Sequence, residues 1–347
     1  MSYNIRNMEI HTNIPFKSLT TMKIGGNARF MTEVRTPQEI AQICKNAKNQ
    51  KLPTFVLGGG SNVIAKDEDF NGIIIRIRIP GFEIIANDIN TTTIKIGAGE
   101  IWDSVVKRTT NLRLTGIETM SGIPGTAGAA PVQNIGAYGQ EIAETLISLE
   151  AYDMQNEKFI TLQNADCKFS YRNSIFRNEL AGKYIITSIT LKLSKNIPQP
   201  PFYESLQKYL DDNNIKIFTV NIIRNAVIEV RKNKLPDPEL LPNTGSFFKN
   251  AIIDKWQFDN LMTKYPNMPS YDMGDNQYKI PTGWLIETAG LKGNLIQGIR
   301  IYDKNSLVLI NESATLYKDL ETARDEIISK VRDMFNIQIE QEPLEIN

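Results

Sequence analysis

Apolar and polar residues along the first part of the chain form a pattern that predicts one helix followed by two strands. The helix is expected to begin after Thr36, because Pro37 and Glu39 complete a capping box with proline at the first helical position. Its buried stripe has helical spacing and consists of Ile40, Ile43, Cys44 and Ala47. Residues 54–57 are a continuous apolar run and predict a buried strand, and residues 72–77 predict another. This order of elements favours an α/β layer.

The middle of the chain follows a different pattern. Residues 93–97 predict a strand and residues 102–108 a helix. Residues 121–139 are rich in Gly and Ala and predict no regular element. Residues 184–193 alternate apolar and polar positions, which is typical of a half-exposed antiparallel strand. Several closely spaced prolines then interrupt the pattern, and we expect an irregular excursion around Tyr203.

The last part of the chain predicts a strand, a long helix and a final short strand. Residues 306–311 are strand-like, and Ser313 is expected to cap a helix whose apolar positions run from 316 to 334. Residues 337–340 predict the final strand. Together these elements predict a β-α-β unit, whose crossover should be right-handed.

Composition excludes several classes of protein. The 347 residues suit two or three domains, and 41% apolar residues suffice to build their cores. Lys plus Arg equals Asp plus Glu at 39 each, so no net charge favours nucleic acid or an anionic membrane. No apolar run is long enough to span a bilayer, and the N-terminus lacks the apolar core of a signal peptide. Cys44 and Cys167 are far apart, which argues against a disulfide or a zinc site, and both are expected in the core.

The single histidine restricts the chemistry. His11 lies near the N-terminus, so a catalytic triad, a Cys-His dyad or a His-ligated metal would each depend on this one side chain. No metal site is therefore expected. Proton transfer has to use Ser, Tyr, Glu, Lys or water.

Two glycine-dense segments are suited to main-chain contacts with phosphate. The first, residues 58–62, follows a predicted strand, but Val63 breaks the Rossmann pattern and a plain tight turn explains it equally well. The second, residues 121–128, has glycine at every third position, and residues 133–139 add side-chain amides. A flexible linker is the alternative, but Ile123 and its apolar neighbours are not typical of one. Two such loops suggest an extended diphosphate ligand.

Five motifs, in the same order, resemble those of the UDP-N-acetylenolpyruvoylglucosamine reductase (MurB) family. They are GGGSN, GIPGTAGAAPVQNIGAYG, SYRNSIF, KLPDP and NTGSFFKN. The resemblance extends from about residue 20 almost to the C-terminus. The resemblance implies an α+β fold, with an FAD-binding domain of the vanillyl-alcohol-oxidase (PCMH) type and a C-terminal α/β substrate-binding domain. We expect FAD-binding subdomains at 1–80 and 81–233, with a tyrosine-loop excursion near 198–215 as in the longer type of the family. The substrate-binding domain is expected at 234–347, and its last residues can return to the first subdomain.

The family implies an NADPH-dependent oxidoreductase with non-covalently bound FAD. Its UDP-N-acetylmuramate dehydrogenase reaction reduces the enolpyruvyl ether of UDP-N-acetylglucosamine, in peptidoglycan precursor synthesis and hence cell-wall biogenesis. We expect a cytoplasmic monomer that acts on this UDP-sugar and binds neither nucleic acid nor membrane. The reaction needs a hydride donor, a cation beside the substrate carboxylate and a proton donor.

The resemblance also assigns residues to these tasks. Ser246 matches the proton donor, Arg172 the cation beside the carboxylate, and Glu342 the catalytic glutamate. The expected FAD-binding residues are Gly58, Gly59, Gly60, Ser61, Asn62, Gly122, Gly125, Thr126, Gly128, Ala129, Gln133, Gly136, Ala137 and Tyr138. The residues expected to contact the substrate or the NADPH diphosphate are Tyr171, Tyr203, Lys234, Asn250 and Asn305.

Several alternatives remain open. Taken alone, Ser246 suits a turn, Arg172 an exposed surface and Asn305 the turn before a strand. Relatives continue after the glutamate with a valine and a basic residue, whereas this chain has Pro343-Leu344, so Glu340 competes with Glu342. A flavin-dependent sugar or alcohol oxidase of the same superfamily, or a non-catalytic nucleotide-binding module, would share the fold. Such oxidases often tether FAD through His or Cys, and neither residue type occurs in the glycine segments.

Overall fold

The computed structural model describes residues 3–5 and 8–346. The chain divides into two units, and each is assembled from segments distant in sequence. The first unit comprises the chain up to Ile14, Ala28–Gly59 and Phe70–Lys232. The second comprises Pro15–Asn27, Gly60–Asp69 and the chain from Asn233 onward.

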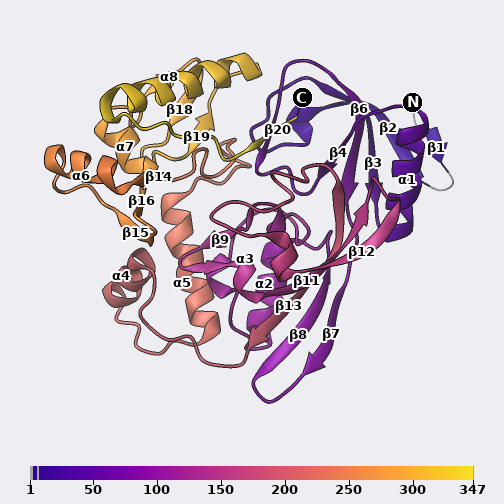
Figure 1. Cartoon of the computed structure of the whole chain (residues 1–347), viewed down its shortest axis with the longest axis horizontal. Helices are drawn as coiled ribbons and strands as arrows, with labels where there is room; N and C mark the ends of the chain where they lie inside the picture. The colour runs from indigo at the N-terminus through magenta and orange to yellow at the C-terminus, as the bar shows by residue number, and fades with distance from the viewer. Residues whose placement is uncertain (1–2, 6–7, 347) are drawn as a thin grey trace. The chain divides into compact units, whose positions relative to one another are not determined.

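The first unit contains a sheet whose central strands are parallel (Figure 1). In spatial order its strands are β1 (Tyr3–Ile5), β2 (Met8–Pro15), β3 (Asn27–Val34), β6 (Phe70–Ile77) and β4 (Thr54–Leu57). Both β3 and β4 pair parallel with β6, so the predicted α/β layer is confirmed. Helix α1 (Pro37–Asn49) has the predicted capping box: the Glu39 N–H donates to the Thr36 hydroxyl and the Thr36 N–H donates to the Glu39 carboxylate. Its predicted apolar stripe is buried.

A second sheet in the same unit is antiparallel throughout. Its order is β12 (Lys158–Gln163), β11 (Leu146–Asp153), β13 (Tyr184–Ser194), β8 (Thr91–Gly97) and β7 (Phe82–Asn87). The predicted helix after β8 is α2 (Trp102–Asn111). The prediction of a half-exposed β13 is wrong, because this strand is central and mostly buried. Two of its buried polar residues are satisfied within the sheet: the hydroxyls of Thr187 and Ser188 donate to the carbonyl and the carboxylate of Glu150 at 3.1 and 2.9 Å.

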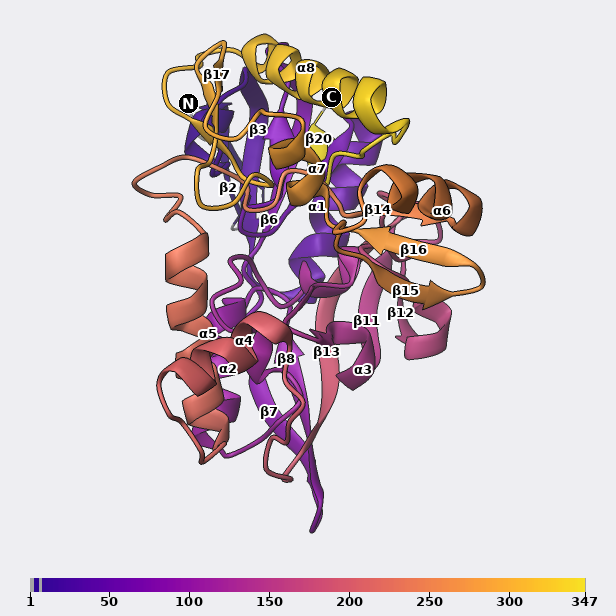
Figure 2. The ribbon, with the colours of Figure 1, turned by 90° about the vertical axis from the view of Figure 1, so that its left-hand side faces the viewer.

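The proline-rich excursion contains a helix, α4 (Glu204–Asp212), and is followed by α5 (Val220–Lys234); Figure 2 shows both together with α2. They enclose a small core of their own, formed by Leu206, Leu210, Ile223, Ala226 and Val227. The expectation of an irregular segment is therefore wrong beyond Tyr203. Apolar residues three and four apart carried the helical signal, which the preceding prolines obscured.

The second unit combines small antiparallel sheets with helices. One sheet has the order β14 (Ala251–Asp254), β16 (Gln277–Ile280) and β15 (Tyr271–Gly274), and another has β17 (Leu295–Ile296), β18 (Ile299–Ile301) and β19 (Leu309–Asn311). The helices are α6 (Lys255–Lys264), α7 (Thr282–Thr288) and α8 (Tyr317–Phe335). The core contains the apolar face of α8, with Leu320, Ala323, Ile327 and Val331 fully buried.

The predicted β-α-β unit at the end of the chain does not form. The strand before α8, β19, pairs antiparallel with β18, whereas the final strand β20 (Leu344–Ile346) pairs parallel with β5 (Val63–Ala65). Residues 337–340 are not a strand, and Ile337 and Ile339 are buried as an extended segment that has the same alternation as a strand. Helix α8 begins at Tyr317 rather than after Ser313, because the Asp67 carboxylate accepts the N–H groups of Tyr317 and Lys318 at 2.7 and 3.1 Å. Among the described residues, no helix is long and apolar enough to cross a membrane.

Candidate active site

The two glycine segments approach each other within the first unit. Gly58 and Gly59 follow β4, and a Cβ atom on Gly59 would lie 2.8 Å from the Cα atom of Gly125. A Cβ atom on Gly58 would lie 2.8 Å from the Thr126 hydroxyl and 3.2 Å from the Ala129 methyl group. Since real Cβ atoms do not come this close, the two main chains meet only where no side chain intervenes. Main-chain N–H groups of glycines are the donors that a diphosphate ligand requires, although those of Gly122 and Gly128 already donate to Asp103 and to the Ala98 carbonyl.

Other candidate cofactor residues continue both segments. A Cβ atom on Gly128 would lie 2.5 Å from the Ala98 methyl group at the end of β8, so this glycine permits close packing. Gly60, Ser61 and Asn62 belong to the second unit. There Gly60 has a φ of +71°, and its carbonyl accepts the Thr21 N–H at 3.1 Å.

An ion pair between the buried Arg224 and the partly exposed Asp103 fixes the start of the second glycine segment. The Asp103 carboxylate on α2 accepts the N–H of Gly122 at 2.6 Å and two hydrogen bonds from Arg224 on α5 at 2.7 and 2.8 Å. Burial alone would raise the pKa of Asp103, but the hydrogen bonds from Arg224 and Gly122 hold it below its ordinary value. The sequence did not predict this pair, because its pattern did not predict the helix that carries Arg224.

We expect Asp103→Asn to reduce the free energy of unfolding by about 1–2 kcal/mol near pH 7, because it leaves the buried Arg224 guanidinium without its counter-charge, while solvent at the partly exposed Asp103 screens part of the effect. Asp103 has a lowered folded-state pKa, so its stabilisation is present above the unfolded pKa of about 3.9 and is lost as the pH falls through the folded pKa. Urea unfolding of both proteins at a series of pH values measures this difference. Glu229→Gln removes an exposed ion pair with Lys232 on the same helix, and should change stability by less than about 1 kcal/mol. Equal losses for both variants would contradict the prediction.

The turn that carries Tyr171 and Arg172 is attached to the second glycine segment. Ser170 and Asn173 exchange main-chain hydrogen bonds at 3.2 and 3.0 Å, which places Tyr171 and Arg172 at the tip of the turn. Arg172 has a φ of +53° and donates to the carbonyl oxygen of Gly136 at 2.8 Å. The hydroxyl of Ser174 donates to the carbonyl of Val132 at 2.6 Å.

Further side-chain hydrogen bonds hold the turn and the glycine segment in place. The amide of Asn134 donates to the carbonyl of Ser170 at 3.1 Å, and Arg177 donates to the side chain of Gln133 at 3.0 Å. The hydroxyl of Thr119 donates to the carbonyl of Ala137 at 2.8 Å. The structure therefore brings Tyr171, Arg172 and the predicted residues of segment 133–137 together.

The aromatic residue at the end of the glycine segment contacts the excursion. The rings of Tyr138 and Tyr203 meet edge to face, with centroids 5.9 Å apart. Arg231 on α5 lies beside the start of the same glycine segment: a Cβ atom on Gly122 would be 3.2 Å from the Nε atom of Arg231. Burial raises the pKa of Tyr138, and the Arg231 guanidinium acts in the opposite direction. The sequence analysis missed Arg231, although it lies seven residues after Arg224 and shares that face of α5.

A second group of candidate residues lies in the second unit. The N–H of Phe247 donates to the carbonyl of Leu307 at 2.7 Å, and its carbonyl accepts the N–H of Glu342 at 2.8 Å. Ser246 therefore precedes a residue that is held on both sides, and Ser246 itself forms a β-bridge with Val308. Glu342 is only 8% exposed, whereas the exposed Glu340 forms an ion pair with Lys249 at 2.8 Å.

The remaining candidates lie in turns or at element ends. Lys234 is exposed at the last position of α5. Asn250 accepts the N–H of Thr282 at 3.1 Å, and Asn305 accepts the N–H of Leu307 at 3.2 Å, as a turn residue does. Asn243, which the sequence analysis did not single out, accepts the N–H of Gly245 at 2.7 Å and so fixes the turn before Ser246.

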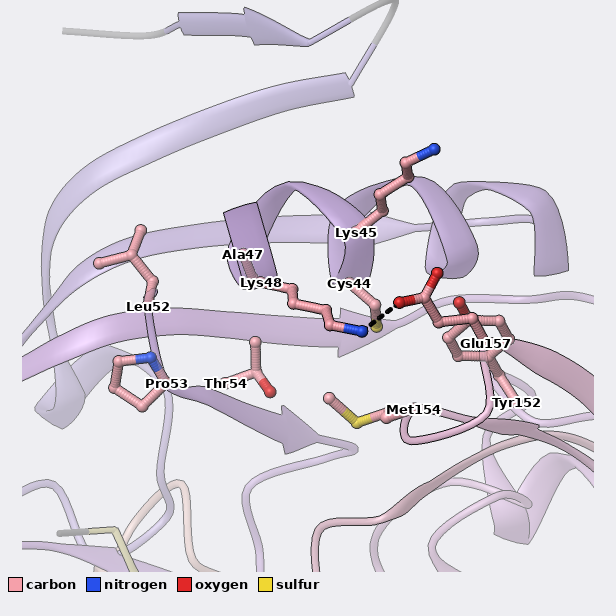
Figure 3. Close-up of a pocket in the computed structure, with 10 residues that line it drawn as sticks. All are labelled: Cys44, Lys45, Ala47, Lys48, Leu52, Pro53, Thr54, Tyr152, Met154 and Glu157. Atoms are coloured by element: carbon pink, nitrogen blue, oxygen red, sulfur yellow. Dashed lines mark hydrogen bonds and ion pairs between the residues drawn. The ribbon is translucent and has the colours of Figure 1, made fainter. Parts of the chain in front are cut away.

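A separate cavity of about 230 Å³ lies against α1 and contains none of the candidate residues (Figure 3). Its lining includes the Cys44 thiol, and the ion pair between Lys48 and Glu157 lies beside it. Burial raises the pKa of Cys44 to about 12, and that of Cys167 equally. Both cysteines are buried, as predicted, and their raised pKa values keep the thiols protonated and therefore unreactive.

Comparison with known proteins agrees with this arrangement. A family model described as FAD binding domain matches residues 28–163, and the model of the C-terminal domain of UDP-N-acetylenolpyruvoylglucosamine reductase matches residues 237–346. The crystal structure of the reductase from Thermus caldophilus aligns over 98% of this chain and 100% of its own, with a TM-score of 0.67 and 22% identity, which supports the fold.

Curated relatives match over nearly their whole length. The chain is 39% identical to UDP-N-acetylenolpyruvoylglucosamine reductase from Flavobacterium johnsoniae, over 96% of this chain and 99% of that protein. It is 38% identical to the Ralstonia nicotianae reductase, over 96% and 98% respectively. The flavin-binding α+β fold expected from the sequence is confirmed, and the chain belongs to the UDP-N-acetylenolpyruvoylglucosamine reductase family.

Proposed function

We propose that this protein reduces the enolpyruvyl ether of UDP-N-acetylglucosamine to the D-lactyl ether of UDP-N-acetylmuramate, with non-covalent FAD and NADPH. The observation that carries the proposal is the pairing between Phe247 and Glu342, which holds the Ser246 segment beside a buried carboxylate. Because the only histidine, His11, lies in the first unit, the second unit has to transfer protons through residues such as these.

The residues of the glycine segments fit an FAD diphosphate. Gly58, Gly59 and Gly125 would offer main-chain N–H groups, and a side chain at Gly58 or Gly59 would fill the place where the segments meet. The Asp103–Arg224 pair holds Gly122 and thereby the start of the second segment. When bound, FAD supplies a hydride to the terminal vinyl carbon of the substrate after reduction by NADPH.

The protein's own residues then stabilise and complete the product. Arg172 would bind the substrate carboxylate, where negative charge develops, through a fork of N–H donors that stays charged. Ser246 would donate a proton to the carbon next to that carboxylate, so that one hydride and one proton saturate the double bond. Glu342 is the second acid–base group, and its burial favours it over the exposed, ion-paired Glu340.

Further residues would bind the ends of the substrates. Lys234 is suited to a diphosphate as a point charge, and Tyr203 would close over the substrate from the excursion. We propose that Tyr171, Asn250 and Asn305 contact the substrate or the NADPH diphosphate. We also propose FAD-binding subdomains at 1–80 and 81–233, a substrate-binding domain at 234–347, and a cytoplasmic monomer with the UDP-sugar as its small-molecule ligand.

The purified protein is expected to be yellow and to release intact FAD on heating, because neither glycine segment contains a His or Cys for covalent attachment. Chromatography of the supernatant identifies the released cofactor. NADPH should bleach the visible absorbance, and the enolpyruvyl sugar should restore it. A colourless protein that takes up no FAD contradicts the proposal, and rapid recovery with oxygen alone indicates an oxidase instead. Absorbance that NADPH leaves unchanged would favour a non-catalytic nucleotide-binding module.

A further inference from the structure

The C-terminal segment is held by one arginine on both sides of Glu342. Arg324 on α8 donates through one terminal nitrogen to the side-chain oxygen of Gln341 at 3.2 Å and to the Glu345 carboxylate at 3.0 Å. The side chain of Arg324 is only 17% exposed. Because Gln341 precedes Glu342 and Glu345 follows it, this guanidinium connects the two flanks of the carboxylate.

Neighbouring contacts close this connection into a network. The Tyr317 hydroxyl donates to the Glu345 carboxylate at 2.7 Å and accepts from Arg324 at 3.2 Å. The Gln341 amide donates to the Pro343 carbonyl at 2.9 Å and to Glu345 at 3.3 Å. Asp67 accepts the first N–H groups of α8, so the helix that carries Arg324 is itself fixed within the unit.

The main chain holds this segment at several points, and one of them is Glu342 itself, whose N–H donates to the Phe247 carbonyl at 2.8 Å. Gln341 forms a β-bridge with Phe248, and from Leu344 onward the segment pairs with β5. Between them, Pro343 has no N–H group to donate. The Arg324 network adds side-chain contacts on both flanks of the hydrogen bond between Glu342 and Phe247.

We propose that Arg324 is a positioning residue for Glu342, which acts through Gln341 and Glu345 to keep the buried carboxylate against the Ser246 segment. The inference rests on the proposed function in so far as it assigns Glu342 to the reaction. It adds a residue from α8 that acts on Glu342 through its two sequence neighbours.

The test compares Arg324→Leu with Arg324→Lys and with Arg332→Leu, a control for an exposed arginine on the same helix. In holoenzyme, hydrogen exchange of the Glu342 N–H should be at least about tenfold faster in Arg324→Leu, because its bond to Phe247 opens more often. Bleaching by NADPH should be unchanged, and recovery with the enolpyruvyl sugar should be roughly tenfold to a hundredfold slower. In Arg324→Lys, the rate of hydrogen exchange and the rate of recovery with the sugar should both lie between those of Arg324→Leu and the wild type. Arg332→Leu should behave like the wild type.

The two readouts separate this inference from the proposed function. If wild-type absorbance does not recover with the enolpyruvyl sugar, the proposed function fails, while hydrogen exchange at Glu342 still decides the positioning role. Should Arg324→Leu fail to fold, Gln341→Ala removes the three side-chain hydrogen bonds of Gln341 and keeps the Arg324–Glu345 ion pair, and the same faster exchange is expected. Wild-type exchange at Glu342 in the folded variant, or wild-type recovery with the sugar despite faster exchange, would overturn the inference.

Discussion

Ser246→Ala is expected to slow recovery of the flavin absorbance by the enolpyruvyl sugar about 10²- to 10⁴-fold, while bleaching by NADPH keeps a near-normal rate. The reason is that hydride addition leaves negative charge on the carbon beside the carboxylate, which a proton must neutralise. Reduction by NADPH requires no proton from Ser246. Stopped-flow absorbance measures both half-reactions on one sample.

The geometry makes this separation a fair test of the serine. Phe247, the next residue, is fixed by hydrogen bonds to Leu307 and Glu342, so loss of one hydroxyl should leave the main chain in place. Ser246→Cys should retain more activity than Ser246→Ala, because a thiol can still donate a proton. If alanine slows both half-reactions equally, the serine is structural and Glu342 is the next proton donor to test. If it slows neither, the proposed mechanism is wrong.

Arg172→Lys is expected to reduce turnover by at least about 2 kcal/mol of transition-state stabilisation, roughly a 30-fold loss. Lysine keeps the positive charge but lacks the planar fork of donors, one arm of which binds the Gly136 carbonyl at 2.8 Å. Measurement of kcat/KM for the enolpyruvyl sugar checks this expectation.

A control variant separates the effect of the Arg172 guanidinium from the effect of its left-handed main-chain conformation. Arg113 has a left-handed φ of +58°, close to the +53° of Arg172, but is exposed at the end of α2. Arg113→Lys should therefore change neither turnover nor stability noticeably. Near-normal turnover of Arg172→Lys would mean that Arg172 does not contact the developing charge.

Local features of the fold could be predicted from sequence because their causes lie within a few residues. The capping box of Thr36 and Glu39 and the apolar stripe behind it need only helical spacing. The two glycine segments suggested one shared diphosphate ligand, and Gly59 and Gly125 do lie close together, although their approach itself was not predicted.

Features that depend on distant partners could not be predicted. The polar residues of β13 gave the signature of an exposed face, but Glu150 on the neighbouring strand satisfies them inside the sheet. The start of α8 is set by Asp67, 250 positions earlier. The ion pair of Asp103 with Arg224 likewise spans 121 positions. Among the candidate residues, the resemblance supplied the roles, whereas the local sequence at Ser246 and Arg172 suggested only a turn and a surface.

The pairing of β20 with β5 constrains how the second unit can be made in the cell. Its segment Gly60–Asp69 is synthesised early, but the partner strand Leu344–Ile346 and the helix that Asp67 caps emerge far later. During translation, the strand in this early segment therefore remains unpaired, and an unpaired strand edge is a surface prone to aggregation. The unit can thus complete its folding only after residues 344–346 have been synthesised.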